Sequence, residues 1–434
     1  MATSSDAGQD ATIAAETSDT AAETADTEDT IDTIDASTAE QNLPLDATGV
    51  PMNMIMDSES GDAARRELMK DVFAYETRIS EIERTEGAFG AGLAEQLLGM
   101  GLAQQRNGDH FAAIQTFKRG VHLARINEGL YSERQMALLQ GEIASHIAMG
   151  DFTAADERQR YLFRVQAETL SDVSRGQALM QHAVWQRQAY EQGLGEQPFS
   201  RLLRMSSLYR LALSEIASSE GDTSPSLLPP LYGMLRSQYL VSGFVGETST
   251  GRFRTRGMVQ EEESQQTAYR SQSFKRGSSV IRAIYDIEMA QPDATWEVAA
   301  RASLMLADWQ LWHGKRNDAF ETYAGLFGEL EVTDAAKVWR NQAFAEPRPL
   351  PDIDGVRGLP ERAEGEAGNL LVEFGVTERG RVVDLKRLDT YASNDEKADD
   401  IIRRIKQSLF RPRFSDGMPV RTEGLRWAYD IRQW

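Results

Sequence analysis

The side chains that most often carry catalysis are scarce or scattered in this sequence. Cysteine is absent, which excludes disulfides, thiolate metal sites and a cysteine nucleophile. No two histidines lie within four residues of each other, so the paired spacing of a zinc site is missing. The five are His110, His122, His146, His182 and His313. Nucleophile-elbow, P-loop and calcium-loop spacings are missing as well. We therefore expect no enzymatic activity, no metal ion and no cofactor.

The negative charge of the chain is concentrated at one end. The 434 residues carry a formal charge of −20, and residues 1–62 hold 15 acidic residues without a lysine or arginine. Such a segment cannot bury enough apolar surface to offset chain entropy, so residues 1–60 are predicted to be a disordered acidic tail. The remainder, with 52 acidic and 47 basic residues, lacks the basic face of a nucleic-acid-binding protein. No apolar run approaches the ~18 residues of a transmembrane helix.

Residues 61–345 show the apolar spacing of helices, with small residues at regular offsets. Two sets of four residues share one spacing: Gly101, Gly108, Ala113 and Phe117, and Ala307, Gly314, Ala319 and Tyr323. A weaker third set contains Gly150, which lies 42 residues after Gly108. These intervals resemble a tetratricopeptide repeat, in which small residues let antiparallel helices approach and a ring fills the groove. We therefore predict a tetratricopeptide-like helical solenoid over residues 61–345.

Two segments depart from the helical pattern. Residues 244–278 are polar and weakly periodic, which predicts a long loop. The segment from Phe344 to Pro360 contains four prolines, and proline blocks both a helix and a central strand. We therefore predict an extended linker over residues 346–358 and a separate domain over residues 359–434.

The last domain has the pattern of strands around one helix. Apolar residues alternate between Leu370 and Val376, which predicts a half-buried strand. Gly380 is placed to take a positive φ in the turn that follows, and residues 382–388 return as the second strand. A helix with an apolar stripe comes next, and the final strand has four residues on one face. These four are Leu425, Trp427, Tyr429 and Ile431.

An ordered set of residues in this domain resembles a known family. The set is Pro360, Phe374, Gly380, Phe410, Pro412, Gly417 and Pro419. Each residue is common alone, but the order resembles the C-terminal domain of the TonB energy-transducer family. Leu359 stands where that family has a tyrosine, which removes a hydroxyl from the pattern. The resemblance implies a small α+β domain of strands and one helix.

The resemblance also implies a function. A periplasmic domain of this kind recruits a partner by strand addition, for example an extended peptide of an outer-membrane transporter or another envelope protein. We expect the final strand, residues 425–431, to be the docking edge, and a secretion signal to have been removed before Met1. The chain would then be a protein-interaction adaptor whose helical repeats bind a second partner. The alternative is a structural role, in which this domain only caps the helices or forms a homodimer.

Overall fold

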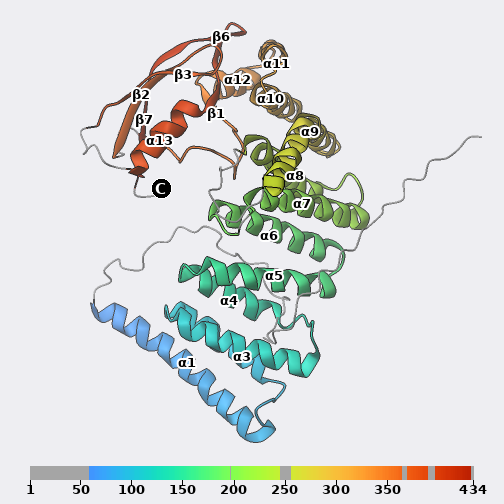
Figure 1. Ribbon diagram of the computed structural model, residues 1–434, viewed down its shortest axis with the longest axis vertical. Helices are drawn as coiled ribbons and strands as arrows, with labels where there is room; N and C mark the ends of the chain where they lie inside the picture. Colours follow the sequence, from blue (N-terminus) through green and yellow to red (C-terminus); the bar gives the residue numbers. More distant parts are fainter. Residues whose placement is uncertain (1–57, 196, 245–255, 364–368, 390–395, 432–434) are drawn as a thin grey trace, which may run out of the picture. The chain divides into compact units, whose positions relative to one another are not determined.

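The computed structural model describes residues 58–195, 197–244, 256–363, 369–389 and 396–431 (Figure 1). These residues are mostly helical, with a few short strands at the C-terminal end. The first helix begins at Ser58, so residues 58–60 belong to a helix and not to the predicted tail. The rest of the predicted acidic tail lies outside the described residues.

Twelve helices precede the three-stranded sheet in the described part of the chain. They are α1 (Ser58–Glu86), α2 (Leu93–Arg106), α3 (His110–Glu128), α4 (Met136–Ala148), α5 (Phe152–Thr169), α6 (Asp172–Glu191), α7 (Pro198–Glu220), α8 (Leu228–Gly243), α9 (Arg256–Met289), α10 (Trp296–Trp312), α11 (Arg316–Glu329) and α12 (Asp334–Phe344). A short 3-10 turn, η1 (Pro225–Leu227), leads into α8. From α1 to α11 each helix packs against the next one along the chain.

Three of the turns between these helices share one backbone geometry. The turn glycine has a φ of 78° at Gly108, 75° at Gly150 and 74° at Gly314. In all three turns the N–H of the next residue donates to a carbonyl five residues earlier, at 2.9 Å. The side chains of Asp109 and Asp151 then cap α3 and α5. The positive φ explains why glycine stands at these offsets.

The residues predicted to pack the helices lie in two buried clusters. Phe117 is buried between α2 and α4, where a Cβ added to Gly101 would lie 2.4 Å from its ring and one added to Gly141 would lie 2.5 Å away. Ala113 belongs to the same buried cluster. The second predicted set also lies in one buried cluster, formed by Ala307, Ala319 and Tyr323 with their neighbours. Glycine is required at position 101 by this close approach.

The predicted loop over residues 244–278 is wrong for residues 256–278, because α9 begins at Arg256 and continues to Met289. Residues 245–255 lie outside the described residues. The helix packs against α8 and α10, and a Cβ on its Gly277 would lie only 2.3 Å from the Trp309 ring. Polar residues dominate the N-terminal half of α9, so the apolar period that marks a helix in sequence is weak there.

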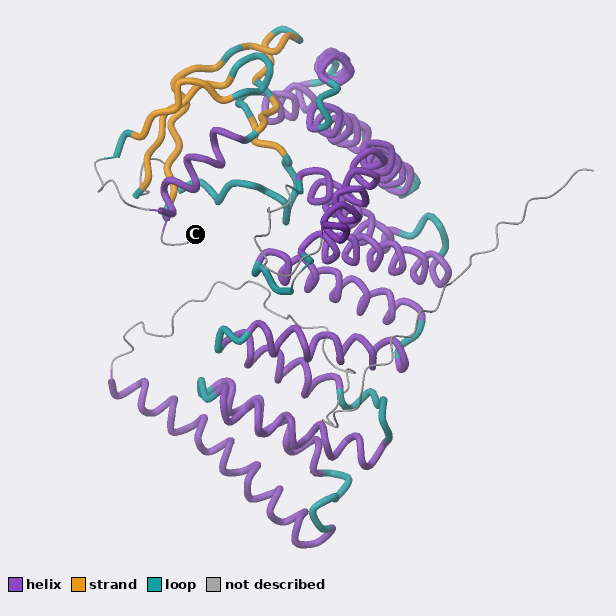
Figure 2. The backbone as a smooth tube through the Cα atoms, viewed as in Figure 1, coloured by secondary structure: helices purple, strands orange, loops and turns teal. Residues whose placement is uncertain are grey.

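The C-terminal part contains seven strands and one helix among its described residues (Figure 2). They are β1 (Arg348–Leu350), β2 (Leu370–Val376), β3 (Val382–Arg387), α13 (Glu396–Gln407), β4 (Leu409–Arg411), β5 (Arg413–Ser415), β6 (Met418–Val420) and β7 (Thr422–Tyr429). β2 lies between β3 and β7 in an antiparallel sheet. The sequence pattern predicted β2, β3, α13 and β7 but not the short strands between α13 and β7.

β1 comes from the segment predicted to be a linker. It pairs antiparallel with β4, with Leu350 opposite Leu409. An isolated bridge between Arg381 and Leu409 then connects β4 to the residue before β3. Within the segment predicted to be an extended linker, only β1 is a strand, and the chain then turns at residues 353–355, where Gly355 has a φ of 81°. The segment also takes part in the pairing of the C-terminal strands.

The sheet and α13 enclose an aromatic core. The Trp427 ring lies 5.0 Å from that of Phe374 and 5.7 Å from that of Phe410. Gly380 has a φ of 73°, and a Cβ there would lie 2.0 Å from the Phe410 carbonyl oxygen. The Phe410 N–H donates to the Gly380 carbonyl at 2.9 Å. The turn before β3 is therefore tied to β4, and it requires glycine for two reasons.

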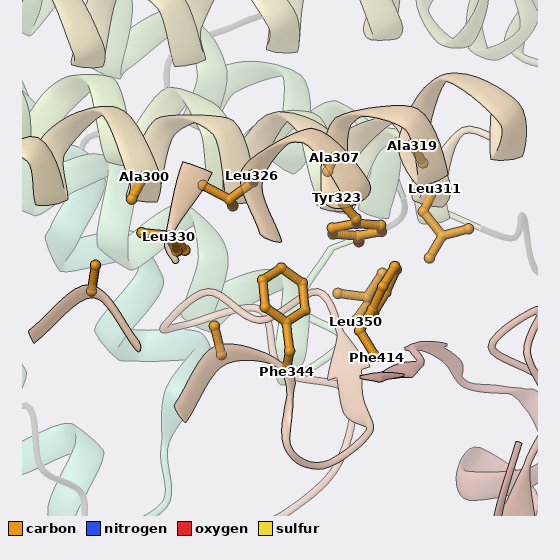
Figure 3. Packing of buried hydrophobic residues seen from close by; sticks show 12 residues of the cluster. Ala300, Ala307, Leu311, Ala319, Tyr323, Leu326, Leu330, Phe344, Leu350 and Phe414 are labelled. Carbon is orange, nitrogen blue, oxygen red and sulfur yellow. The ribbon is translucent and has the colours of Figure 1, made fainter. Parts of the chain in front are cut away.

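A second core joins the strands to helices α10, α11 and α12 (Figure 3). Leu350 of β1 and Phe414 of β5 are buried in it. The Phe414 ring lies 5.2 Å from the Tyr323 ring and 5.1 Å from the Phe344 ring. Helices that precede the predicted linker and a strand that follows it therefore bury apolar surface against each other.

Candidate docking site

β7 lies at one edge of the three-stranded sheet, as the strand predicted to bind a partner must. Its predicted contact side chains face the core, however. Tyr429 is 1% exposed, Trp427 5% and Ile431 8%, and Leu425 is half-buried. Ile431 also lies beyond the strand, which ends at Tyr429. These four side chains hold β7 in place, so a partner would meet the main chain of the strand instead.

The main chain of β7 has one side turned toward β2 and one turned outward. Trp427 stands opposite Val372 of β2. The carbonyl of Ala428 faces the other way and accepts a hydrogen bond from the Ala363 N–H at 2.9 Å. Arg426, two residues before Ala428, has the same outward main-chain orientation. A segment of this chain thus already attaches to the outer edge of β7 by a main-chain hydrogen bond.

A groove of about 590 Å³ lies beside this edge, and we call it the docking groove. One wall is the end of β7, residues 426–429. The other wall is formed by the proline-rich residues 347–352 and 357–363, which include the predicted motif residue Pro360. A groove that runs beside an edge strand suits an extended peptide better than a folded domain.

The proline-rich wall is fixed to the helices. Ile353 and Val356 pack against the apolar cluster formed by α8, α9 and α10. The Arg187 guanidinium of α6 donates to the Gly355 carbonyl at 3.3 Å. The groove is therefore formed before any partner arrives, which reduces the entropy cost of binding.

Two aromatic residues give the groove its local chemistry. The Arg362 guanidinium lies over the Trp427 ring, 4.8 Å from its centroid, and forms an ion pair with Glu346 at 3.9 Å. The Tyr429 hydroxyl is buried and has no hydrogen-bond partner among the described residues. Burial raises the pKa of this hydroxyl, so it is a neutral donor at physiological pH.

A buried ion cluster behind the groove links its wall to the helices. The Arg411 guanidinium of β4 donates to Asp308 Oδ2 of α10 at 2.7 Å and to Asp352 Oδ2 of the wall at 3.0 Å. The Tyr323 hydroxyl donates to Asp308 Oδ1 at 2.5 Å. Burial raises the pKa of Asp308, whereas the Arg411 charge opposes that shift. Arg411 stays charged, because the surrounding acids raise its pKa against the effect of burial.

The opposite edge of the sheet, β3, is less suited to docking. Asp384 in the middle of the strand has a φ of 55°, which interrupts a regular ladder. Lys386 places an exposed charge on the same strand, and the bridge from Arg381 to Leu409 closes its beginning. Irregular geometry and charge are the usual protections of an edge strand against added chains.

The remaining motif residues do not line the groove. Phe374, Gly380 and Phe410 belong to the core described above. Pro412 lies between β4 and β5, and Pro419 lies within β6. Gly417, with a φ of 76°, completes the two-residue hairpin turn between β5 and β6. Sequence reasoning missed Arg411, since the neighbouring Arg413 is exposed and the two look equivalent in the motif.

In the part of the chain that the structure describes, no helix has the length and apolar character needed to cross a membrane. This finding agrees with the absence of a long apolar run in the sequence.

Comparisons with known proteins add little to this geometry. No family model and no curated protein matches the chain. The crystal structure of BtubC (BKLC) from P. vanneervenii is similar over 69% of this chain and 96% of that chain, with 13% sequence identity and a TM-score of 0.35. A similarity of this size carries no inference about the fold or the function.

Proposed function

We propose that the chain is a protein-interaction adaptor that holds an extended segment of a partner in the docking groove. The observation that carries this proposal is the edge position of β7 beside a preformed groove of about 590 Å³. The hydrogen bond from Ala363 to Ala428 supports it, since it is the type of contact that an added strand makes. The helical part would be a tetratricopeptide-like scaffold that binds a second partner, supported by the three equivalent turns.

The setting of this adaptor follows from the resemblance to the TonB C-terminal domain. It would be periplasmic, and its partner would be an envelope or outer-membrane transport protein. The second candidate is self-assembly, in which β7 of one copy pairs with β7 of another. The same outer edge supports both candidates, so the measurement must separate them.

The experiment uses a single position with two replacements. Arg426→Pro removes an outward N–H from β7 while leaving the bonds to β2, and Arg426→Ala removes only the side chain. We expect the full chain to bind fluorescein-labelled twelve-residue peptides with alternating apolar residues, and Arg426→Pro to lose most of that binding. Arg426→Ala should keep the part of the peptide binding that comes from the main chain of β7.

Circular dichroism of both variants checks that the fold survives. Peptide binding that is equal in the proline and alanine variants would refute strand addition at β7. Sedimentation velocity over a concentration series tests the second candidate: a dimer that Arg426→Pro dissociates, without any peptide binding, would favour self-assembly.

A further inference from the structure

A second hollow adjoins the docking groove. It has a volume of about 530 Å³ and shares Leu350, Pro351, Gly358 and Ser408 with the groove. The proline-rich wall therefore separates two hollows that meet along it. One side of the second hollow belongs to the helices α6, α8 and α10, and the other to the end of α13 and the residues around β4.

The two hollows differ in their walls. The docking groove is bounded by the main chain of β7, whereas the second hollow presents the side chains of Tyr190 and Trp312 together with Leu409. Trp312 is held by a hydrogen bond from its indole N–H to Ser242 Oγ at 2.9 Å. Aromatic walls that are fixed in this way suit an apolar anchor residue.

The charges around both hollows are mainly positive. Six arginines line them, against two carboxylates: Arg348, Arg357, Arg362, Arg381, Arg404 and Arg426, with Asp352 and Glu361. Asp352 is already paired with Arg411. The second hollow has two of these arginines and no acidic residue in its lining. This excess contrasts with the chain as a whole, whose formal charge is −20.

Arg348 and Arg381 are the arginines best placed to meet a ligand. Both are exposed, and neither forms an ion pair within the described ranges, which leave out residues 364–368 and 390–395. The other four form surface ion pairs with carboxylates outside the hollows, which are worth only about 0–1 kcal/mol each. An anionic ligand could therefore engage Arg348 and Arg381 without first breaking a partner away.

We propose that the partner is an acidic extended segment that occupies both hollows at once. Its carboxylates lie against Arg348 and Arg381, and an apolar side chain lies against Tyr190 and Trp312. This inference rests on the proposed function, to which it adds the chemical class of the partner and the part of the helices that contacts it. An extended residue spans about 3.3 Å, so a segment of roughly a dozen residues has the reach to pass along both hollows.

The test measures binding of the full chain to three labelled twelve-residue peptides with one central phenylalanine. One carries alternate glutamates, the second has glutamine in their place, and the third has lysine. We expect the glutamate peptide to bind about tenfold more tightly than the glutamine peptide at low salt, with the difference shrinking as salt rises. The lysine peptide should bind more weakly than either.

Charge reversals then locate the contacts. Arg348→Glu in the docking groove and Arg381→Glu in the second hollow should each weaken the glutamate peptide by about fivefold or more. Arg379→Glu is the matched control, because Arg379 is exposed in the same turn as Arg381 but lines neither hollow. It should change the affinity less than about twofold.

The outcomes separate this inference from the proposed function. If the glutamate and glutamine peptides bind equally and Arg426→Pro still abolishes the binding, the partner is not selected for its acidic residues. The adaptor function would then stand without the acidic partner. If only Arg348→Glu weakens the binding of the glutamate peptide, the proposal that one segment occupies both hollows would be overturned. Failure of every peptide to bind would overturn both proposals, and a dimer that excludes the peptides would assign the hollows to a second copy.

Discussion

The buried cluster around Arg411 offers the sharpest test of how the strands are held to the helices. Arg411 is 2% exposed and bridges Asp308 at 2.7 Å and Asp352 at 3.0 Å. Replacing Arg411 by methionine removes the guanidinium but keeps most of the volume, so Asp308 is left buried with only the Tyr323 hydroxyl. Breaking a buried pair from one side costs about 3–5 kcal/mol of unfolding free energy.

The loss of unfolding free energy caused by Arg411→Met should be larger at higher pH. Without Arg411, burial and the nearby Asp352 carboxylate raise the pKa of Asp308 above its ordinary value of 3.8, and only the hydrogen bond from Tyr323 opposes this shift. A carboxyl whose pKa is higher in the folded protein than in the unfolded chain contributes to folding stability below the unfolded pKa. That contribution is lost as the pH rises through the folded pKa. We therefore expect Arg411→Met to be more destabilising at pH 7 than at pH 5, where Asp308 takes up a proton more readily.

The assay is urea unfolding at both pH values, followed by circular dichroism and by tryptophan fluorescence. A double-mutant cycle adds Asp308→Asn and the variant that carries both substitutions. We expect a favourable coupling of about 1–3 kcal/mol between Arg411 and Asp308. Arg413→Met is the control, because Arg413 is exposed two residues further on and should change stability by less than about 0.5 kcal/mol. A cost below about 1 kcal/mol for Arg411→Met, or one that is identical at both pH values with an additive cycle, would refute this account.

Three further predictions concern other parts of the chain. Burial lowers the pKa of His182 to about 4, so folding stability should fall between pH 6.5 and pH 4 by up to about 3 kcal/mol, and His182→Gln should flatten that part of a urea-unfolding pH profile. A steeper profile in the variant would contradict the assignment. Gly101→Val drives a side chain into the Phe117 ring and should cost roughly 1–3 kcal/mol or more in the same assay, whereas unchanged stability would contradict the packing. Gly380→Ala should destabilise the C-terminal strands, seen as faster amide hydrogen exchange there, because a Cβ meets the Phe410 carbonyl.

Sequence patterns were most informative where one residue type satisfies a local geometric need. Gly108, Gly150 and Gly314 could be aligned because each turn requires a positive φ. β2 and α13 were predictable because each buries one face and so repeats its apolar residues at a regular interval. The resemblance suggested the last strand as the docking edge, and β7 lies at an edge of the sheet.

Other features depend on contacts between distant residues and leave little trace in the sequence. β1 has only three residues, so no alternation marks it, and its existence depends on β4. The sequence predicts that Trp427 and Tyr429 share one face of the last strand. It does not predict that this face points into the core. The docking groove could not be predicted, because it forms where the proline-rich wall is held against β7 by the helices.

The pairing of β1 with β4 has a consequence for how the chain folds and how it can be divided. β1 leaves the ribosome about 60 residues before β4, the strand that it pairs with, so the last helices stay open at this end until β4 has been synthesised. A fragment that starts after residue 350 would lack its own neighbour for β4 and would expose Phe414. The C-terminal part therefore cannot be transplanted at the apparent boundary, and a workable exchange between proteins would have to carry α10 to α12 with it.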